Sequence, residues 1–308
     1  MACCGYEKRL ENYFFQLNGR DFKIEVTDFG LFLNENKNFM RHSFLIFILI
    51  FSVHCSISAQ EEVAKLGSSA QELADKLANP VASLISVPFQ NNINYGIGPY
   101  NGVKYTLNIQ PVIPFKLSDN LNLITRYILP VVDQRNITGL NAHEFGLSDA
   151  TVTAFFAPKS KKIIYGIGPA LLIPTGTQKF LGTQKFGIGP GALVMHQGKG
   201  LTVGFIANQI WSVAGADDRS DVNQFYTQVF LSHSYKSGAS WGVNAEITQN
   251  WESNMTLISL NPTLGGITKF GDQVVQFSVQ PLIPIVGHES IRPDWGLRAA
   301  VAFVFPGS

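Results

Sequence analysis

Two histidine–glutamate pairs are the features of this 308-residue sequence that come closest to hydrolytic chemistry. His143-Glu144 and His288-Glu289 each place a general base beside a carboxylate, in segments that we expect to be loops. A serine nucleophile or a metal would have to complete such a site, yet the sequence has neither a Gly-x-Ser-x-Gly elbow nor a His-x-x-x-His pair. We therefore predict no catalytic residue, no metal site and no cofactor.

An acidic run, Asp217-Asp218-Arg219-Ser220-Asp221, is the densest cluster of charge in the sequence. Carboxylate oxygens bind Ca²⁺, but this run lacks the glycine and the distal glutamate of an EF-hand loop. We therefore favour a solvated loop in which Arg219 forms a local ion pair with a neighbouring carboxylate.

Polar side chains also recur at every second position of several segments, where they would share one face of a strand. If the apolar faces of these strands point outward, the polar faces line the interior of a barrel. The residues predicted to line it are Lys104, Asn108, Arg126, Gln228, Asn244, Glu246, Gln276 and Arg298. The four charged residues among them could select solutes by the sign of their charge. Alternatively, these four pair with one another and brace a filled interior.

The segments that carry these polar residues alternate them with apolar residues. Residues 103–110 show the alternation, and residues 241–248 and 275–280 repeat it. Successive side chains of a strand point to opposite faces, so each segment has one apolar and one polar face. Many such segments in series predict a barrel whose apolar face meets lipid.

We expect about twelve such strands within residues 81–308. Their approximate bounds are 82–95, 103–116, 121–132, 145–157, 162–174, 186–197, 201–212, 222–236, 240–251, 256–268, 273–286 and 295–305. The connections between them are short and long in turn, except at 252–254, where a long one is expected and a short one found. Outer-membrane barrels alternate short periplasmic turns with longer outer loops and have an even number of strands. The predicted fold is therefore all-β, a transmembrane antiparallel up-and-down β-barrel.

Prolines and aromatic residues modify this pattern. Residues 166–169 and 187–190 both read Gly-Ile-Gly-Pro. Because proline removes a ladder hydrogen bond, we expect these prolines at strand ends, at bulges or at the barrel rim. Aromatic residues such as Trp241, Trp251 and Trp295 fall near the predicted strand ends. They are expected as girdles at the membrane interfaces, and the alternative is the core of a β-sandwich.

An apolar segment near the N-terminus has the features of a secretory signal peptide. Residues 40–59 begin with basic residues, continue with an apolar core of about ten residues, and end in small residues. Cleavage would fall between Ala59 and Gln60. The alternative, a lipid attached at Cys55, is disfavoured because His54 stands where a small residue is needed.

The segments on either side of this signal are interpreted from composition and spacing. Residues 1–39 are polar and charged, and we interpret them as an extension upstream of a start at Met40. A cytosolic tail is the alternative. Residues 60–80 carry apolar residues at three- and four-residue spacing, which predicts a short periplasmic helix. That helix would cap the barrel mouth or, alternatively, enter the lumen as a plug.

Composition restricts the partners of the chain. The net charge is +1 and 15% of the residues are charged, which argues against a nucleic-acid partner. All three cysteines precede Gln60, so the mature chain would have none, as suits an oxidising compartment. We expect Sec-type export to the outer membrane, with outer-membrane lipid, lipopolysaccharide and the barrel-assembly machinery as partners. The oligomeric state does not follow from the sequence.

Several stretches resemble a bacterial family of outer-membrane β-barrels. They are residues 77–88, 108–114, 211–215 and 295–298. The family is often labelled "neuromedin U", a misnomer taken from a peptide hormone, or simply "transporter". It is akin to outer-membrane proteins grouped with the meta-pathway of phenol degradation. The resemblance covers nearly all of residues 78–305 and implies a barrel with a transport role and no established catalytic residues.

Three hypotheses for function follow from these observations. The first is a passive outer-membrane channel for small molecules, including hydrophobic ones. The second is a structural or adhesive barrel with a closed lumen. The third is a membrane-embedded lipid hydrolase that uses the histidine–glutamate pairs.

Overall fold

The computed structural model describes residues 13–17, 20–24, 84–159, 163–271 and 273–306. The chain divides into two compact units, Met1–Cys55 and Ser56–Ser308. In the first unit, β1 (Tyr13–Leu17) and β2 (Arg20–Ile24) pair as an antiparallel hairpin.

Several predictions for the N-terminal region lie outside the described residues. They are the signal peptide at 40–59, the cleavage site between Ala59 and Gln60, and the helix at 60–80. Within the residues that are described, no helix is long and apolar enough to cross a membrane.

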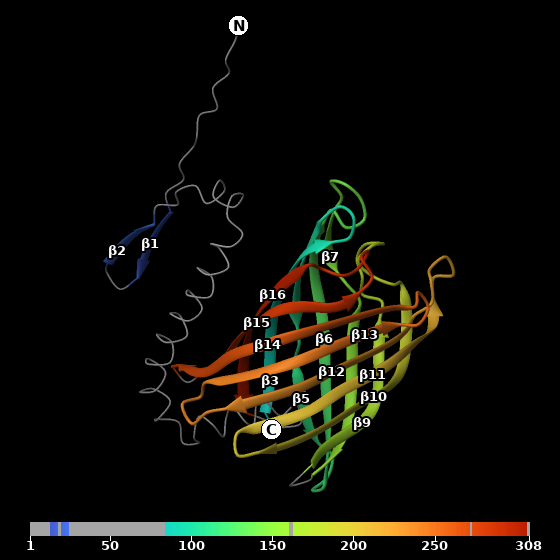
Figure 1. Ribbon diagram of the computed structural model, residues 1–308. Helices are drawn as coiled ribbons and strands as arrows, with labels where there is room; N and C mark the ends of the chain where they lie inside the picture. Colours follow the sequence, from blue (N-terminus) through green and yellow to red (C-terminus); the bar gives the residue numbers. More distant parts are fainter. Residues whose placement is uncertain (1–12, 18–19, 25–83, 160–162, 272, 307–308) are drawn as a thin grey trace. The chain divides into compact units, whose positions relative to one another are not determined.

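The second unit is a closed β-barrel in which every strand runs antiparallel to its neighbours (Figure 1). Its strands are β3 (Leu84–Ile97), β4 (Gly102–Ile109), β5 (Val112–Lys116), β6 (Leu121–Arg135), β7 (His143–Leu147), β8 (Ala150–Pro158), β9 (Ile163–Ile173), β10 (Lys185–Gly198), β11 (Leu201–Gly215), β12 (Asn223–Ser234), β13 (Ser240–Asn250), β14 (Met255–Phe270), β15 (Gln273–Gly287) and β16 (Trp295–Pro306). The barrel closes because β16 pairs with β3 along its length, with Trp295 opposite Tyr95. Closure pairs the first and last strands of the sheet with each other, so that neither presents a free edge to lipid.

The fourteen segments of this sheet make a barrel of twelve strands because two strands are interrupted. Both β4 and β5 lie between β3 and β6, and they are separated at Gln110-Pro111, where proline offers no N–H to the ladder. Both β7 and β8 pair with β6, and they are separated at Ser148-Asp149. The predicted all-β barrel of about twelve strands is confirmed.

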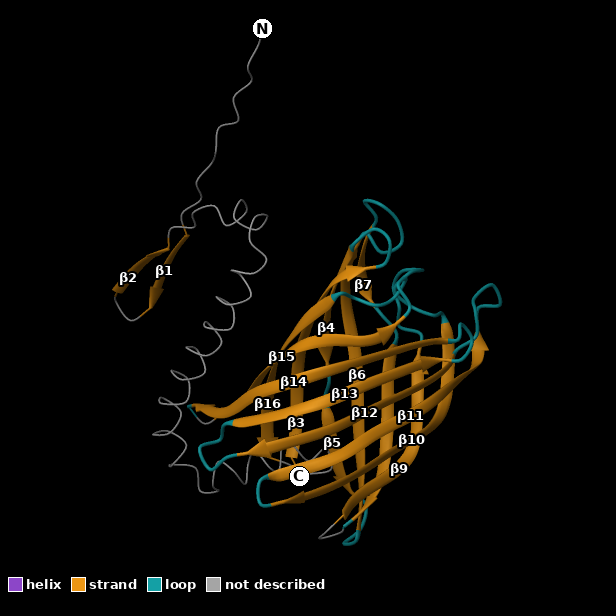
Figure 2. Ribbon diagram, viewed as in Figure 1, coloured by secondary structure: helices purple, strands orange, loops and turns teal. Residues whose placement is uncertain are grey.

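The connections fall at two ends of the barrel (Figure 2). One end, here called the outer end, carries the connections that follow β3, β6, β9, β11, β13 and β15. The opposite, inner end carries the shorter connections that follow β5, β8, β10, β12 and β14, and β16 finishes there. The outer connection at 251–254 is short, as its sequence indicates, and so is the one at 98–101.

Two Gly-Pro steps lie face to face inside neighbouring strands. Pro169 of β9 is opposite Pro190 of β10. A Cβ added to Gly168, which precedes Pro169, would lie 1.8 Å from the carbonyl oxygen of Ala154 on β8. A Cβ added to Gly189, which precedes Pro190, would lie 1.8 Å from the carbonyl oxygen of Gln209 on β11. These prolines were expected at strand ends, bulges or the rim. They lie instead within strands, at gaps in the pairing with β8 and β11, because proline has no N–H to donate there.

The interior of the barrel is filled with apolar side chains on one side, toward the inner end. Phe155 of β8, Leu193 of β10 and Ile206 of β11 form one buried cluster. Met195 of β10 and Ile124 of β6 are each 1% exposed. Side chains thus fill this part of the lumen, as they do in small barrels.

The outward face of the barrel is apolar and carries aromatic residues near both ends. Toward the outer end, Tyr95 and Trp295 stack with ring centroids 4.7 Å apart, and Trp211 is exposed. Toward the inner end, Tyr165 and Trp241 are exposed. This arrangement matches the aromatic girdles that flank the lipid-facing band of outer-membrane barrels.

Candidate pore lining

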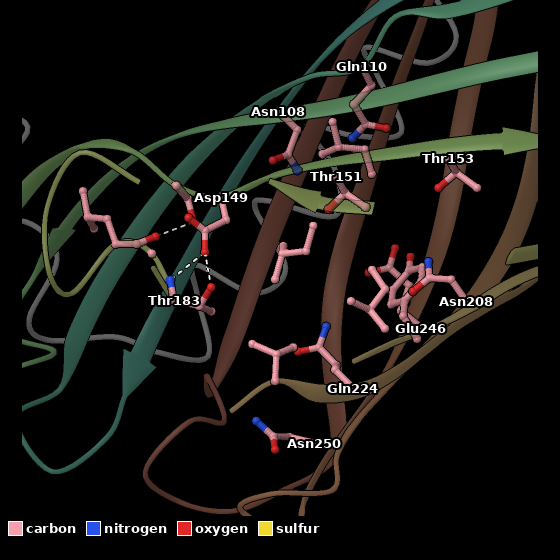
Figure 3. Close-up of a pocket in the computed structure, with 18 of the residues that line it drawn as sticks. Asn108, Gln110, Asp149, Thr151, Thr153, Thr183, Asn208, Gln224, Glu246 and Asn250 are labelled. Atoms are coloured by element: carbon pink, nitrogen blue, oxygen red, sulfur yellow. Dashed lines mark hydrogen bonds between the residues drawn. The ribbon is translucent and has the colours of Figure 1, made fainter. Parts of the chain in front are cut away.

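The barrel interior is hollow and polar toward the outer end (Figure 3). A cavity of about 830 Å³, here called the outer cavity, lies there. Its polar lining includes Asn108, Gln110, Asp149, Thr151, Thr153, Thr183, Asn208, Gln224, Glu246 and Asn250. Most of these side chains come from alternate positions of different strands, which all point inward. Their amides, hydroxyls and carboxylates suit the cavity to water and to polar solutes.

Two smaller cavities adjoin the outer one. The inner cavity, of about 320 Å³, lies between β12 and β16 toward the inner end and has no charged residue in its lining. The side cavity, of about 310 Å³, is lined by Lys104 and by Ile291 from the connection after β15. The outer and inner cavities share Gln228, and the outer and side cavities share Glu246 and Arg298. The inner and side cavities therefore each adjoin the outer cavity, around the middle of the barrel.

The residues that the sequence predicts to line the interior all border one of these cavities. They are Lys104, Asn108, Arg126, Gln228, Asn244, Glu246, Gln276 and Arg298. Strand alternation accounts for their placement. A role of these side chains in the passage of a solute stays a prediction.

Arg298 is the centre of a polar network that crosses the lumen. Its two terminal nitrogens donate to the two carboxylate oxygens of Glu246, at 2.5 and 3.2 Å. Its Nε donates to Asn92 Oδ1 at 2.6 Å, and Nη1 donates to Gln280 Oε1 at 3.3 Å. Glu246 belongs to β13 and Arg298 to β16, and β14 and β15 lie between these two strands in the sheet. The ion pair therefore links two strands that are not neighbours in the barrel wall. Internal pairing, the alternative raised by the sequence, thus holds for these two charges.

The other two basic residues of the lumen have no direct carboxylate partner among the described residues. Arg126 Nη2 donates to Gln110 Oε1 at 3.1 Å, and Gln110 donates in turn to Gln90 at 2.9 Å. Lys104 borders the side cavity, and no hydrogen bond or ion pair within the described residues holds it. Both positive charges therefore face the cavities without a carboxylate directly against them.

The connection after β9 borders the outer cavity and is fixed by Asp149. One carboxylate oxygen accepts hydrogen bonds from the N–H and the hydroxyl of Thr183, at 2.5 and 2.6 Å (Figure 3). The other oxygen accepts the N–H of Gly176 at 3.0 Å. Phe180 of this connection also borders the cavity. Sequence reasoning missed Asp149, because no local pattern shows that it reaches a segment 27 to 34 residues away.

Arg219 does not form the ion pair that was predicted within the acidic run. It donates instead to the backbone carbonyl oxygens of Lys179, Gly182 and Thr183, at 2.9, 2.8 and 3.4 Å. A guanidinium has five donors in a fixed fork, so it can satisfy several carbonyl groups at once. Arg219 thereby joins the connection after β11 to the connection after β9.

Asp221, from the same acidic run, is bound to the start of β10. Lys185 Nζ lies 3.1 Å from its Oδ1, and Ser212 Oγ donates to the same oxygen at 3.0 Å. The hydrogen bond from Lys185, followed by that from Ser212, holds the pKa of Asp221 below its ordinary value. In the part of the chain that is described, no three His, Cys, Asp or Glu side chains gather as a metal ion would require.

The two histidine–glutamate pairs do not form a single site. His143 lies on the outward side of β7, with Nε2 3.0 Å from Asp133 Oδ1, whereas the adjacent Glu144 is buried. His288 Nδ1 is 2.8 Å from the hydroxyl of Ser290, within the connection after β15. The described residues bring no serine or threonine hydroxyl within hydrogen-bond distance of His143.

Comparison with known proteins bears on the fold. No model of a known protein family matches the chain, and no curated protein matches it. Among solved structures, an outer membrane channel from Pseudomonas putida F1 is similar, with 16% identity, a TM-score of 0.55, and coverage of 72% of this chain and 94% of that one. The NanC porin has 9% identity, a TM-score of 0.43, and coverage of 72% and 98%.

Outer membrane phospholipase A from Escherichia coli has 8% identity and a TM-score of 0.41, with coverage of 71% of this chain and 89% of that one. Of these three likenesses, only that to the Pseudomonas channel is close enough to bear on the fold. Together with the closed antiparallel sheet and the girdled apolar face, it shows that this chain has the fold of an outer-membrane β-barrel.

Proposed function

We propose that this chain lets small molecules diffuse passively across the outer membrane through the lumen of its barrel. The observation that carries the proposal is the set of three adjoining cavities, which extends from the outer end into the inner half of the barrel. In a barrel with a purely structural role, side chains would fill this space.

The chemistry of the lining favours polar solutes over hydrophobic ones. Gln228, Glu246 and Arg298 stand where the cavities adjoin, so a solute that moves between them passes hydrogen-bonding groups. An apolar solute would displace water from these groups without replacing its hydrogen bonds, which costs free energy. A polar solute can exchange the bonds that it makes with water for bonds to the wall.

The outward face supports a location in the outer membrane. Its apolar surface and its two aromatic girdles suit contact with lipid and lipopolysaccharide. Export would depend on the signal peptide at residues 40–59, and insertion on the barrel-assembly machinery. These partners are part of the proposal.

Liposome swelling tests the passage of solutes. Liposomes that contain the purified protein should swell in isotonic arabinose faster than empty liposomes do, because the sugar enters through the lumen. Swelling in raffinose, a larger sugar, should be slower, because a narrow lumen excludes solutes by size. Rates equal to those of empty liposomes with both sugars would contradict the proposal.

One observation favours a closed structural barrel as a second candidate. The cluster of Phe155, Leu193 and Ile206 blocks one side of the lumen toward the inner end. If it closed the whole cross-section, the protein would support the envelope without conducting. The swelling assay distinguishes the two candidates, because the closed barrel gives no swelling with either sugar.

We propose no catalytic role for the histidine–glutamate pairs. The support is that His143 bonds to Asp133 on the outward side of the barrel, apart from its neighbour Glu144. Phospholipid hydrolysis by the purified wild-type protein should stay at background, and replacing His143 and His288 together with alanine should change nothing. Activity in the wild-type protein that the double variant loses would instead support a hydrolase.

A further inference from the structure

We propose that the lumen holds a binding site for small organic anions, formed by Lys104, Arg298 and Arg126 on one wall of the barrel. The inference rests on the proposed channel function. It narrows the solutes to molecules that carry a carboxylate or a similar anionic group.

The three basic residues form a row that runs from the outer end toward the inner end. On β3, Asn94 lies opposite Lys104, and Asn92 lies opposite Arg298. Arg126 reaches β3 indirectly, because it donates to Gln110, which in turn donates to Gln90 of β3. These three β3 residues occupy alternate positions, so they share the inward face of the strand. An anion moving inward would therefore meet one cation after another along the same wall.

Only one member of the row is neutralised by a direct ion pair. Glu246 engages Arg298 with both of its oxygens. Arg126 interacts with Glu246 through longer-range electrostatics and donates its hydrogen bond to the neutral Gln110. Lys104 has no carboxylate among its described contacts. The row thus carries excess positive charge, and the apolar walls of a barrel focus such a field along its lumen.

Neutral donors beside the cations would complete the recognition of a carboxylate. Asn94 and Thr106 border the side cavity together with Lys104, and Tyr226 borders the outer cavity together with Arg126. Charge-assisted hydrogen bonds from Lys or Arg to a carboxylate are roughly twice as strong as neutral ones. A solute with one carboxylate and several hydroxyls could use both kinds of partner.

The carboxylates near the mouth of the outer cavity do not cancel this charge. Asp149 keeps its charge but is turned toward the connection after β9, where neutral donors hold both of its oxygens, and Asp221 is paired with Lys185. Asp218 is exposed, and Arg219 of opposite charge follows it in the lining. Exposed charges are screened over a distance of about 8 Å at physiological ionic strength, whereas the row is enclosed by the barrel.

The neutral inner cavity gives a bound anion a way to leave. Its lining contains amides and hydroxyls, including Gln276 and Ser278, and no charged residue. Conduction requires that a solute bind well enough to enter and weakly enough to depart. A basic row followed by an uncharged compartment meets both conditions.

Reversal potentials in planar bilayers under a KCl gradient test the charge of the row. The wild-type protein should pass chloride severalfold better than potassium. The double variant Lys104→Gln/Arg126→Gln should lose most of that preference, because both cations without a direct carboxylate partner are gone. A wild-type protein without anion preference, or a double variant with an unchanged reversal potential, would overturn the proposal.

A matched control removes a lysine outside the lumen. Lys116, at the end of β5, has a side chain that is 60% exposed and is paired with Asp119, which is 90% exposed. Lys116→Gln should retain the wild-type reversal potential. Heat-modifiable mobility on gels checks that every variant forms a folded barrel.

Direct binding separates this site from the channel function itself. Calorimetric titration of the detergent-solubilised protein with glucuronate should show binding, and glucose, a neutral sugar of similar size, should bind much more weakly. The double variant should bind glucuronate severalfold more weakly than the wild type does. This result would support the site even in a barrel that fails to conduct. Equal binding of the two sugars, or binding of neither, would overturn it.

Discussion

At the residue scale, the lumen is organised by charged side chains whose partners are distant in sequence. Arg298 meets Glu246 across 52 residues, and Asp149 meets Thr183 across 34. Arg298 donates to both oxygens of Glu246, whereas Thr183 donates to one oxygen of Asp149 and Gly176 to the other. Charge is tolerated away from bulk water when its hydrogen bonds are satisfied in this way. The two remaining cations, Lys104 and Arg126, are the residues left to act on a solute.

Replacing Glu246 with alanine should lower the free energy of unfolding by about 3 kcal/mol, because Arg298 loses its buried carboxylate partner. The side chains of the pair are 10% and 19% exposed, so solvent screens them little. Urea titration of the protein in phospholipid vesicles measures the change. Gln224→Ala removes a polar side chain of the same cavity that takes part in no ion pair, and it should cost much less. Equal losses for the two variants would show that the pair does not brace the barrel.

Protonation of Asp221 should release the connection after β11 from β10. The hydrogen bond from Lys185 depresses the pKa of this carboxyl in the folded state, so its contribution to stability is present above the ordinary value for aspartate, about 3.9. That contribution is lost as the pH falls through the lower, folded-state pKa. In an NMR titration, Lys185→Gln should raise the pKa of Asp221 toward the ordinary value. No change in that pKa would mean that the contact does not form in solution.

At the scale of elements, alternation in the sequence is sufficient to predict the strands but not their interruptions or their loops. The strand expected at 201–212 is found as β11, Leu201–Gly215, because a period of two identifies a two-faced strand directly. The break between β4 and β5 depends on which ladder bond Pro111 removes, and this is known only once the register is known. The contacts of Asp149 and Arg219 depend on how long connections fold, which no periodicity encodes.

The Gly-Pro step of β10 should tolerate no side chain at its glycine. A Cβ at Gly189 would lie 1.8 Å from the carbonyl oxygen of Gln209, and the backbone would have to move. Gly189→Ala should therefore destabilise the barrel by about 1–3 kcal/mol, as overpacking does. Gly198→Ala in the same strand places its Cβ 3.8 Å from the nearest neighbour and serves as the control. Equal urea midpoints for the two variants would contradict the close approach.

At the scale of the whole molecule, the sequence predicts the closed barrel and its polar interior, but not how that interior is divided. The strand number and the inward faces follow from alternation. The interior is divided into a filled side, at Phe155 and Leu193, and three open cavities. This division depends on the volumes of side chains from strands that are far apart in sequence. Such a partition appears only when the barrel has closed and its wall residues face one another.

The central claim, that solutes pass through this lumen, is tested most directly by single-channel conductance in planar bilayers. Gln228 lies where the outer and inner cavities meet, whereas the next residue, Val229, is 47% exposed on the outward face of β12. The wild-type protein should conduct in discrete steps. Gln228→Trp should reduce the step size because it narrows the passage, and Val229→Trp should leave it unchanged. A wild-type protein without steps, or a Gln228→Trp variant that conducts as well as the wild type does, would contradict the account.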